Sequence, residues 1–358
     1  MSAVSSSNTA FALELFRTLS QANSAGNIFV SPLSISSALA MVYLGAKGDT
    51  AAQMAQVSTL SLVTCTMINF QMRLMCVTTA QTNHGLLLES LSALKYSPNR
   101  MEYMDTNLER LTYIFVYVNH QGPLIKDLLK PGTVRSNTRL ALVNAIYFKG
   151  NWRNPFDEAN TQEMPFKNET VPVQMMYQMK KLPYNYIHDH GLQILELPYV
   201  NEELSMFVLL PAESSDGSDP LLKLEKELTQ ERLNEWTDRK NMDVDSEVVL
   251  HLPKFKLVED YELNEPLTKL GMKNVFCAGS ADLSGMNGEG GLFLSTVAHK
   301  AFVEVNEEGT EAAAATAGMI AFCMLREEHF RADHPFLFFI RHNKTKSILF
   351  FGRFSSPQ

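Results

Sequence analysis

The chain has 358 residues, of which 45% are hydrophobic, so it is long enough to bury a large core. Its formal net charge of −8, without any dense lysine or arginine cluster, argues against a nucleic-acid-binding protein. No apolar run is long enough to span a bilayer, so we expect a soluble globular protein with neither nucleic-acid nor membrane partners.

The N-terminal residues favour a helix over an export signal. Residues 1–8 are small and polar, and the apolar residues that follow have helical spacing instead of forming a continuous signal-peptide core. The cysteines are scattered without metal-ligand spacing, as in a cytosolic protein with reduced thiols; they are Cys65, Cys76, Cys277 and Cys323. We therefore expect a cytoplasmic protein without a cleavable signal peptide, and release to the extracellular space is left open.

Periodicity predicts helices and strands in an irregular order. Helical spacing covers residues 8–19 and 32–44, the second with Pro32 in its first turn after a capping Ser31, and a further helix is predicted over residues 220–236. Segments rich in β-branched and aromatic residues predict strands over residues 140–148, 204–210, 247–255, 293–305 and 347–354. Without a linker or repeat, this order favours a single α+β domain over residues 1–358 with large antiparallel sheets.

The sequence lacks the motifs of an enzyme, with no G-x-S-x-G elbow, P-loop, G-x-G-x-x-G or HExxH. Residues 188–190, His-Asp-His, could form half of a metal site, but no second cluster accompanies them, so a surface turn is the better interpretation. The glycine-rich residues 285–291 lack the Lys and Ser/Thr of a nucleotide loop and are interpreted as a plain turn. The sequons at Asn168 and Asn343 are interpreted as chance matches. We expect no catalytic activity, no metal and no cofactor.

The most informative segment is residues 303–324, where a strand runs into an acidic turn, then a run of small residues and a hydrophobic tip. Because alanine favours helices, a surface helix is one interpretation. In a strand, one face would instead carry only small uncharged residues, namely Thr310, Ala312, Ala314, Thr316 and Gly318. Such a face could enter between packed strands without steric conflict.

Four blocks of sequence resemble the serpin family. Residues 307–316, Glu-Glu-Gly-Thr-Glu-Ala-Ala-Ala-Ala-Thr, resemble the serpin hinge, and residues 333–340 with 352–354 resemble its C-terminal signature. Residues 27–34 and 142–152 resemble two further blocks. The resemblance covers about residues 1–57 and 121–358 and is closest to the intracellular clade B type. Residues 58–120 depart from the family pattern and are shortened, and a spliced or frameshifted gene is preferred there to a new module.

The resemblance implies a serpin fold with large, mostly antiparallel sheets, about nine helices and an exposed reactive-centre loop over about residues 307–326. It implies a suicide inhibitor of chymotrypsin-fold serine proteases, elastase-like and chymotrypsin-like. The protease cuts the loop, and the freed hinge joins the main sheet as an antiparallel strand while the acyl-enzyme stays trapped. Serpin loop insertion is itself a known example of strand addition. Target serine proteases are then the partners, and we expect a monomer. The alternative is a non-inhibitory serpin acting as a binding or chaperone module, which the small hinge residues disfavour.

The resemblance also assigns roles to individual residues. The hinge comprises Glu307, Glu308, Gly309, Thr310, Glu311, Ala312, Ala313, Ala314, Ala315 and Thr316. The family's spacing puts the reactive bond at Cys323-Met324, where a small apolar cysteine suits an elastase pocket, and Phe322 would suit a chymotrypsin-like pocket if cleavage shifts by one residue. The conformational-control residues are Ser31, Ser34, Asn144 and His299, in a hydrogen-bonded cluster under the main sheet, and Trp152, which with Glu307 lies where the loop enters.

Overall fold

The structure, a computed structural model, describes residues 3–58, 113–118, 137–148, 150–166, 172–214, 217, 219–288, 290–308 and 327–357. Its mixture of helices and mostly antiparallel sheets confirms the α+β class. These residues contain seven α-helices, fewer than the roughly nine implied by the family resemblance. They are α1 (Ala3–Ala22), α2 (Pro32–Tyr43), α3 (Gly48–Ser58), α6 (Pro220–Glu227), α7 (Gln230–Trp236), α8 (Asn264–Leu270) and α9 (Ser284–Asn287).

The strands form three sheets. The six-stranded sheet is antiparallel, in the order β1 (Ile28–Val30), β14 (Ser347–Phe354), β13 (Phe336–His342), β8 (Leu204–Pro211), β7 (Leu192–Pro198) and β6 (Tyr184–Ile187). The long sheet has the order β10 (Phe255–Glu262), β11 (Leu294–Val305), β3 (Leu140–Phe148) and β2 (Tyr113–Val118). The end sheet has the order β12 (Glu327–Arg331), β9 (Glu247–Pro253), β5 (Pro172–Lys181) and β4 (Gln162–Pro165).

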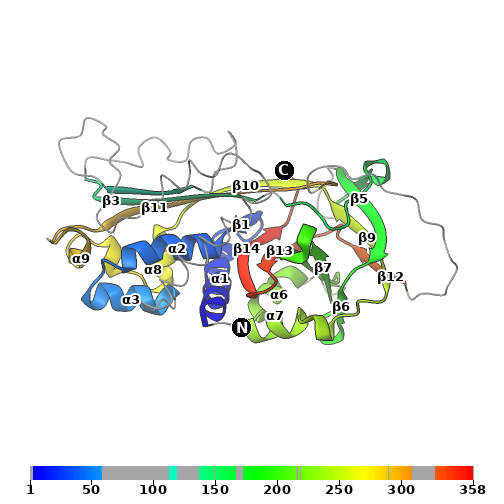
Figure 1. The fold of residues 1–358 in the computed structure, drawn as a ribbon, viewed down its shortest axis with the longest axis horizontal. Helices are drawn as coiled ribbons and strands as arrows, with labels where there is room; N and C mark the ends of the chain where they lie inside the picture. Colours follow the sequence, from blue (N-terminus) through cyan, green and yellow to red (C-terminus); the bar gives the residue numbers. More distant parts are fainter. Residues whose placement is uncertain are drawn as a thin grey trace.

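The long sheet extends along one side of the molecule (Figure 1). Helices α2, α3, α8 and α9 lie beneath one end of it, and the six-stranded sheet lies beneath the other. The end sheet stands at the far end of the molecule, beside the ends of β10 and β11. Two buried apolar clusters result, one between the helices and the strands that they cover and one formed by residues of all three sheets. The long sheet therefore connects the two halves of the core.

Local capping decides where several helices begin. The Ser31 hydroxyl accepts a hydrogen bond from the Ser34 amide and precedes Pro32, so α2 begins as predicted. Residues 220–236 form two helices, and the prediction of a single helix is wrong. Leu228 is extended, and the Thr229 hydroxyl accepts from the Arg232 amide and starts α7. Threonine competes for backbone hydrogen bonds in this way, which is why it interrupts an otherwise helical pattern.

The predicted strand over residues 247–255 is two strands in different sheets. β9 ends at Pro253 and pairs with β5, and β10 begins at Phe255 and pairs with β11. Lys254 lies between them, at the point where the chain passes from the end sheet to the long sheet. Both sides are rich in strand-forming residues, so the composition alone does not reveal the change of sheet.

The glycine-rich residues 285–291 are also more than a turn. α9 includes Gly285, and the turn begins at Gly288, where φ is 74°. A Cβ added to Gly285 would lie 2.8 Å from the carbonyl oxygen of Gly45. The glycine is therefore required by the close packing of α9 against the chain that follows α2.

The C-terminal motif Gly352-Arg353-Phe354 is buried in β14. Arg353 is 1% exposed, and its guanidinium donates to the Glu225 carboxylate and to the Ser20 hydroxyl, each at 2.9 Å. It also donates to the Gly26 carbonyl at 2.8 Å. One buried cation thus joins α1, α6 and β14, and its charge is matched by a buried carboxylate.

We expect Glu225→Ala to destabilise the protein by about 3–5 kcal/mol, because it leaves the buried Arg353 cation without its counterion. The matched control is Glu265→Ala, which removes the exposed i,i+4 pair with Lys269. Urea unfolding of the two variants measures the difference. Equal midpoints would show that the Arg353 pair contributes no more than an exposed one.

Candidate functional site

The candidate site lies where β3 and β11 pair in the middle of the long sheet. The strands run parallel as direct neighbours, from the pair Leu294 and Leu140 to the pair Val303 and Phe148. Eight of the nine residues of β3 and eight of the twelve residues of β11 are buried. β11 ends at Val305, just before the predicted hinge. A strand added between them must replace their mutual hydrogen bonds, and the face that it turns toward the core must carry small uncharged side chains.

The first hinge residue, Glu307, is anchored at the end of β11. Its carboxylate is buried and accepts hydrogen bonds from Lys254 Nζ at 2.8 Å and from Thr161 Oγ1 at 2.9 Å. Its carbonyl oxygen accepts from the Phe156 amide at 2.9 Å. Burial opposes ionisation, but the hydrogen bonds from Lys254 and Thr161 and the charge of Lys254 outweigh it and lower the pKa of Glu307. Glu307 is therefore ionised and held in place at neutral pH.

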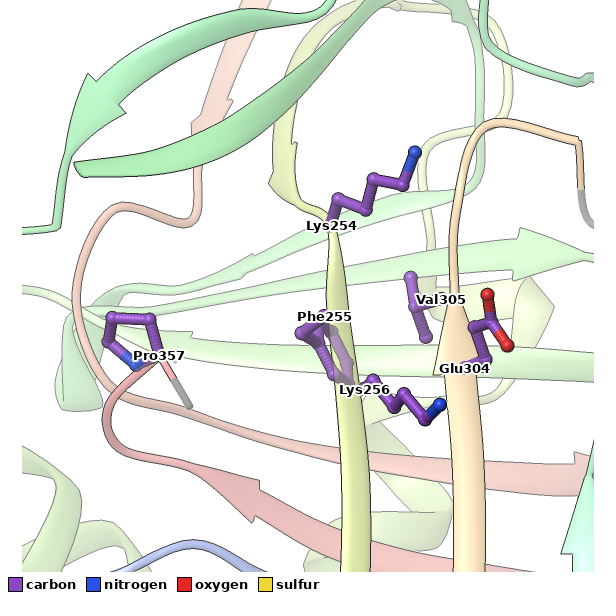
Figure 2. Close-up of a pocket in the computed structure, with 6 residues that line it drawn as sticks. All are labelled: Lys254, Phe255, Lys256, Glu304, Val305 and Pro357. Atoms are coloured by element: carbon purple, nitrogen blue, oxygen red, sulfur yellow. The ribbon is translucent and has the colours of Figure 1, made fainter. Parts of the chain in front are cut away.

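A shallow pocket of about 230 Å³ borders this anchor. It is lined by Lys254, Phe255, Lys256, Glu304, Val305 and Pro357. In Figure 2, Lys254 and Lys256 extend toward β11, and Pro357 lies on the other side of β10. The chain at the start of β10 thus presents two lysines. Lys254 pairs with Glu307, and Lys256 lies over the Phe302 ring, with Nζ 4.9 Å from the ring centroid.

Trp152 braces the chain immediately before Glu307. Its indole Nε1 donates to the Asn306 carbonyl at 2.8 Å, and its ring stacks on Tyr199 with centroids 4.6 Å apart. Tyr199 in turn contacts Phe148, the last residue of β3, with ring centroids 5.2 Å apart. Burial raises the pKa of Tyr199 well above its usual value. The aromatic stack therefore joins the end of β3 to the start of the hinge.

Ser31, Ser34, Asn144 and His299 meet beneath the paired strands, and each is at most 1% exposed. Asn144 of β3 and His299 of β11 are partners in the strand register, with Nδ1 of His299 2.6 Å from Oδ1 of Asn144. The same Asn144 oxygen accepts from the Ser34 hydroxyl at 2.6 Å. The Ser31 hydroxyl donates to the Leu349 carbonyl at 2.7 Å. The cluster therefore joins α2 and β14 to both strands.

The hydrogen bonds define the tautomer of His299. The Ser31 backbone amide donates to Nε2 at 3.2 Å, so Nε2 carries no proton. The proton of the neutral ring is then on Nδ1, which donates to Asn144. Burial lowers the pKa of His299 to about 3, in agreement with a neutral ring.

The predicted control residues thus fall into two groups. Ser31, Ser34, Asn144 and His299 form the cluster, and Trp152 lies with Glu307 at the base of the hinge; Glu308 is exposed beside it. The other predicted loop residues, Gly309, Thr310, Glu311, Ala312, Ala313, Ala314, Ala315, Thr316, Phe322, Cys323 and Met324, lie outside the described residues.

Sequence reasoning missed Lys254, Thr161 and Tyr199. Thr161 lies 146 residues from Glu307 in the chain, and Lys254 is one exposed lysine among many. Neither stands in a recognisable motif. Lys254 could have been identified as a partner of the hinge only from the strand register, in which the first residue of β10 pairs with the last residue of β11.

The remaining motifs that lie among the described residues have structural explanations. Residues 188–190 form a short surface 3-10 helix, in which Nδ1 of His190 lies 3.0 Å from the Glu227 carboxylate. Among the residues described, no group of three or more His, Cys, Asp or Glu could hold a metal ion. The Asn343 amide donates to the Glu202 carbonyl and the Ser205 hydroxyl, each at 2.8 Å. Asn168 lies outside the described residues. No helix in the ranges described is long and apolar enough to cross a membrane.

Comparison with known proteins decides the family. The family described as serpin (serine protease inhibitor) matches residues 6–108 and 116–357. The chain belongs to the serpin family. The match includes residues 58–108, where the family's motifs are not recognisable by inspection, and residues 113–118 form β2 of the long sheet.

This serpin is 47% identical to the leukocyte elastase inhibitors of Xenopus tropicalis and of Homo sapiens, over 380 aligned positions that cover 100% of each chain. Because each alignment is longer than 358 residues, the chain lacks positions that these relatives have.

Solved structures confirm the serpin fold. A tumour-suppressing serpin matches with a TM-score of 0.81 and 32% identity, over 100% of both chains. Uncleaved ovalbumin matches with a TM-score of 0.77 and 31% identity, over 99% of this chain and 100% of its own.

The neutral His299 makes the stability of this serpin depend on pH. The pKa of His299 is lowered on folding, so below about pH 6.5 the unfolded chain binds a proton that the folded one does not. The contribution of His299 is then fully present above that pH and falls by about 2 kcal/mol between pH 7 and pH 5. Melting temperature against pH measures this loss. His299→Gln should flatten the profile, because it removes the buried ring. Identical profiles for the two proteins would contradict the assignment.

We expect Lys254→Met to destabilise the hinge anchor by about 1–3 kcal/mol, because the buried Glu307 carboxylate loses its cationic partner. Lys256→Met is the matched control, since Lys256 faces the Phe302 ring and should cost about 0.5–1 kcal/mol. Adding Glu307→Gln to Lys254→Met should recover part of the loss, and thermal unfolding of the four proteins measures it. If the double variant is no more stable than Lys254→Met, the ion pair is not the source of the effect.

Proposed function

We propose that this serpin is a suicide inhibitor of elastase-like and chymotrypsin-like serine proteases. The observation that carries the proposal is the parallel pairing of β3 with β11, followed directly by a hinge of small residues. A chain that reverses direction after β11 runs antiparallel to β11 and, because β3 is parallel to β11, antiparallel to β3 as well. It can therefore form regular antiparallel hydrogen bonds on both of its edges.

The proposed reaction begins at the Cys323-Met324 bond. The serine oxygen of the protease adds to the Cys323 carbonyl, the peptide bond breaks, and the Met324 amine leaves with a proton supplied by the protease histidine. The Cys323 acyl group stays on the serine while the hinge from Gly309 onward inserts between β3 and β11. Insertion displaces the acylated protease before water hydrolyses the ester.

The two groups of control residues regulate this step in the proposal. Asn144 and His299 link β3 to β11 directly, so the cluster keeps the strands closed until the loop is cut. Glu307 and Trp152 fix the point at which the chain leaves β11. Insertion therefore always begins at the same residue of the hinge.

Target specificity follows from the residues at the bond. Cysteine is small and apolar, as a shallow elastase pocket requires, and Phe322 serves a chymotrypsin-like pocket if cleavage shifts by one residue. The names of the relatives, leukocyte elastase inhibitor, support an elastase-like target. A cytoplasmic location and a monomeric state are part of the same proposal.

Incubation with neutrophil elastase should give a covalent complex that survives boiling in detergent, with a released peptide that begins at Met324.

Thr310→Arg should convert the inhibitor into a substrate, because the first inserting side chain would bury an unpaired charge. Gel electrophoresis and N-terminal sequencing measure both outcomes. A cleaved chain with fully active protease, from the unmodified protein, would refute the inhibitor and favour the non-inhibitory binding module.

A further inference from the structure

We propose that Tyr147 and Phe302 form an aromatic clasp on the outer face of the long sheet, which holds β3 against β11 until the loop inserts. The inference rests on the loop insertion of the proposed function. It adds a contact on the side of the sheet opposite to the hydrogen bond between Asn144 and His299. It concerns described residues of β3, β10 and β11 only.

Strand register places the clasp across the two strands that must separate. Tyr147 of β3 and Phe302 of β11 are paired in the register, so their side chains lie on the same side of the sheet. Successive residues of a strand alternate between its faces, and Phe302 lies between Ala301 and Val303, which are both fully buried in the core. Neither of the two apolar clusters of the described residues includes Phe302 or Tyr147. The two rings therefore lie on the outer face, which is turned away from the six-stranded sheet (Figure 1).

The two rings of the clasp are in close contact. Their centroids lie 4.8 Å apart with an interplanar angle of 25°, in the range of favourable aromatic pairs. Lys256 of β10 adds a cation over the Phe302 ring, with Nζ 4.9 Å from the centroid. Phe302 is only 3% exposed, although it lies on the outer face. The clasp thus buries apolar surface outside the main core and links three neighbouring strands.

Insertion of a strand breaks the contact between the two rings. Neighbouring strands lie about 4.8 Å apart, so a strand placed between β3 and β11 increases their separation to about 10 Å. That distance exceeds the limit of about 7 Å for aromatic pairs. Residues 308–316 of the hinge contain no aromatic side chain that could replace either ring. Because the contact exists only while the sheet is closed, it opposes premature insertion.

Tyr147 is the member of the clasp whose contact changes. Lys256 and Phe302 lie on β10 and β11, which pair along the whole of β10, and insertion between β3 and β11 leaves that pairing intact. Lys256 therefore keeps its contact with Phe302 in both states. A substitution of Tyr147 should consequently affect the intact protein and not the inserted one, which a merely structural residue would not do.

The test compares the melting temperatures of the intact and the cleaved protein. Thermolysin cuts the loop without being trapped, because this zinc protease attacks with water and forms no acyl-enzyme. N-terminal sequencing verifies the site of the cut. Tyr147→Ala should lower the melting temperature of the intact protein by about 2–5 °C and leave that of the cleaved protein unchanged. Tyr147→Phe keeps the ring and should restore the melting temperature of the intact protein.

The matched control is Tyr177→Ala on β5. Tyr177 is partly buried, as Tyr147 is, and its ring centroid lies 5.1 Å from that of its register partner His251 on β9. Insertion does not separate β5 from β9. The control should therefore lower the melting temperatures of the intact and the cleaved protein by the same amount.

A second measurement is the rate at which the uncut protein loses inhibitory activity at 37 °C, when its loop inserts without cleavage. Tyr147→Ala should lose activity about two- to tenfold faster than the unmodified serpin, because the closed sheet lacks the ring contact. Tyr147→Phe and Tyr177→Ala should lose it at the unmodified rate.

The outcomes separate this inference from the proposed function. If Tyr147→Ala lowers both melting temperatures equally, or if Tyr147→Phe restores nothing, the clasp is overturned while the inhibitor stands. If cleavage does not raise the melting temperature of the unmodified serpin, no strand inserts and the clasp is overturned as well. If cleavage raises it but elastase forms no covalent complex, the proposed function fails, and the comparison of the Tyr147 variants still decides the clasp.

Discussion

The hydrogen bond between Asn144 and His299 is the contact on which the proposed mechanism depends, because it joins β3 to β11 where the inserted strand would have to separate them. Polar groups suit this position. A buried hydrogen bond that is left unmade costs about 1–3 kcal/mol, so the strands stay closed until other hydrogen bonds compensate. The neutral ring of His299 also keeps an uncompensated charge out of the core.

The two ends of the proposed reactive loop belong to different sheets. β11, which precedes it, lies in the long sheet, and β12, which follows it, lies at the edge of the end sheet. Glu307 is fixed at the first end by Lys254 and Trp152 holds the residue before it. Cleavage of the loop separates the segment attached to β11 from the segment attached to β12. The chain that follows β11 can then move, while β12 keeps its pairing with β9 and its buried Phe330.

The sequence predicted which segments are helices and strands better than it predicted where one element ends and the next begins. The strands over residues 140–148 and 347–354 agree with β3 and β14, because their long β-branched and aromatic runs leave no other interpretation. The helix over residues 220–236 and the strand over residues 247–255 each divide into two. In both cases the residues favour the same local structure on each side of the break, and a single cap or a change of pairing partner decides where it falls.

By itself the sequence determined the α+β class and the family resemblance, because these depend on local patterns and motifs that can be recognised along the chain. The assignment of the control residues follows from that resemblance and stays a prediction. The tertiary structure alone decided which residues hold the hinge. Lys254 and Thr161 bind Glu307 because the ends of β10 and β11 and the segment before β4 meet in space. It also decided that His299 is neutral and that Tyr147 stacks on Phe302, since burial and strand register are properties of the folded chain. Contacts between residues far apart in the sequence leave no local pattern, and for that reason no spacing could have predicted them.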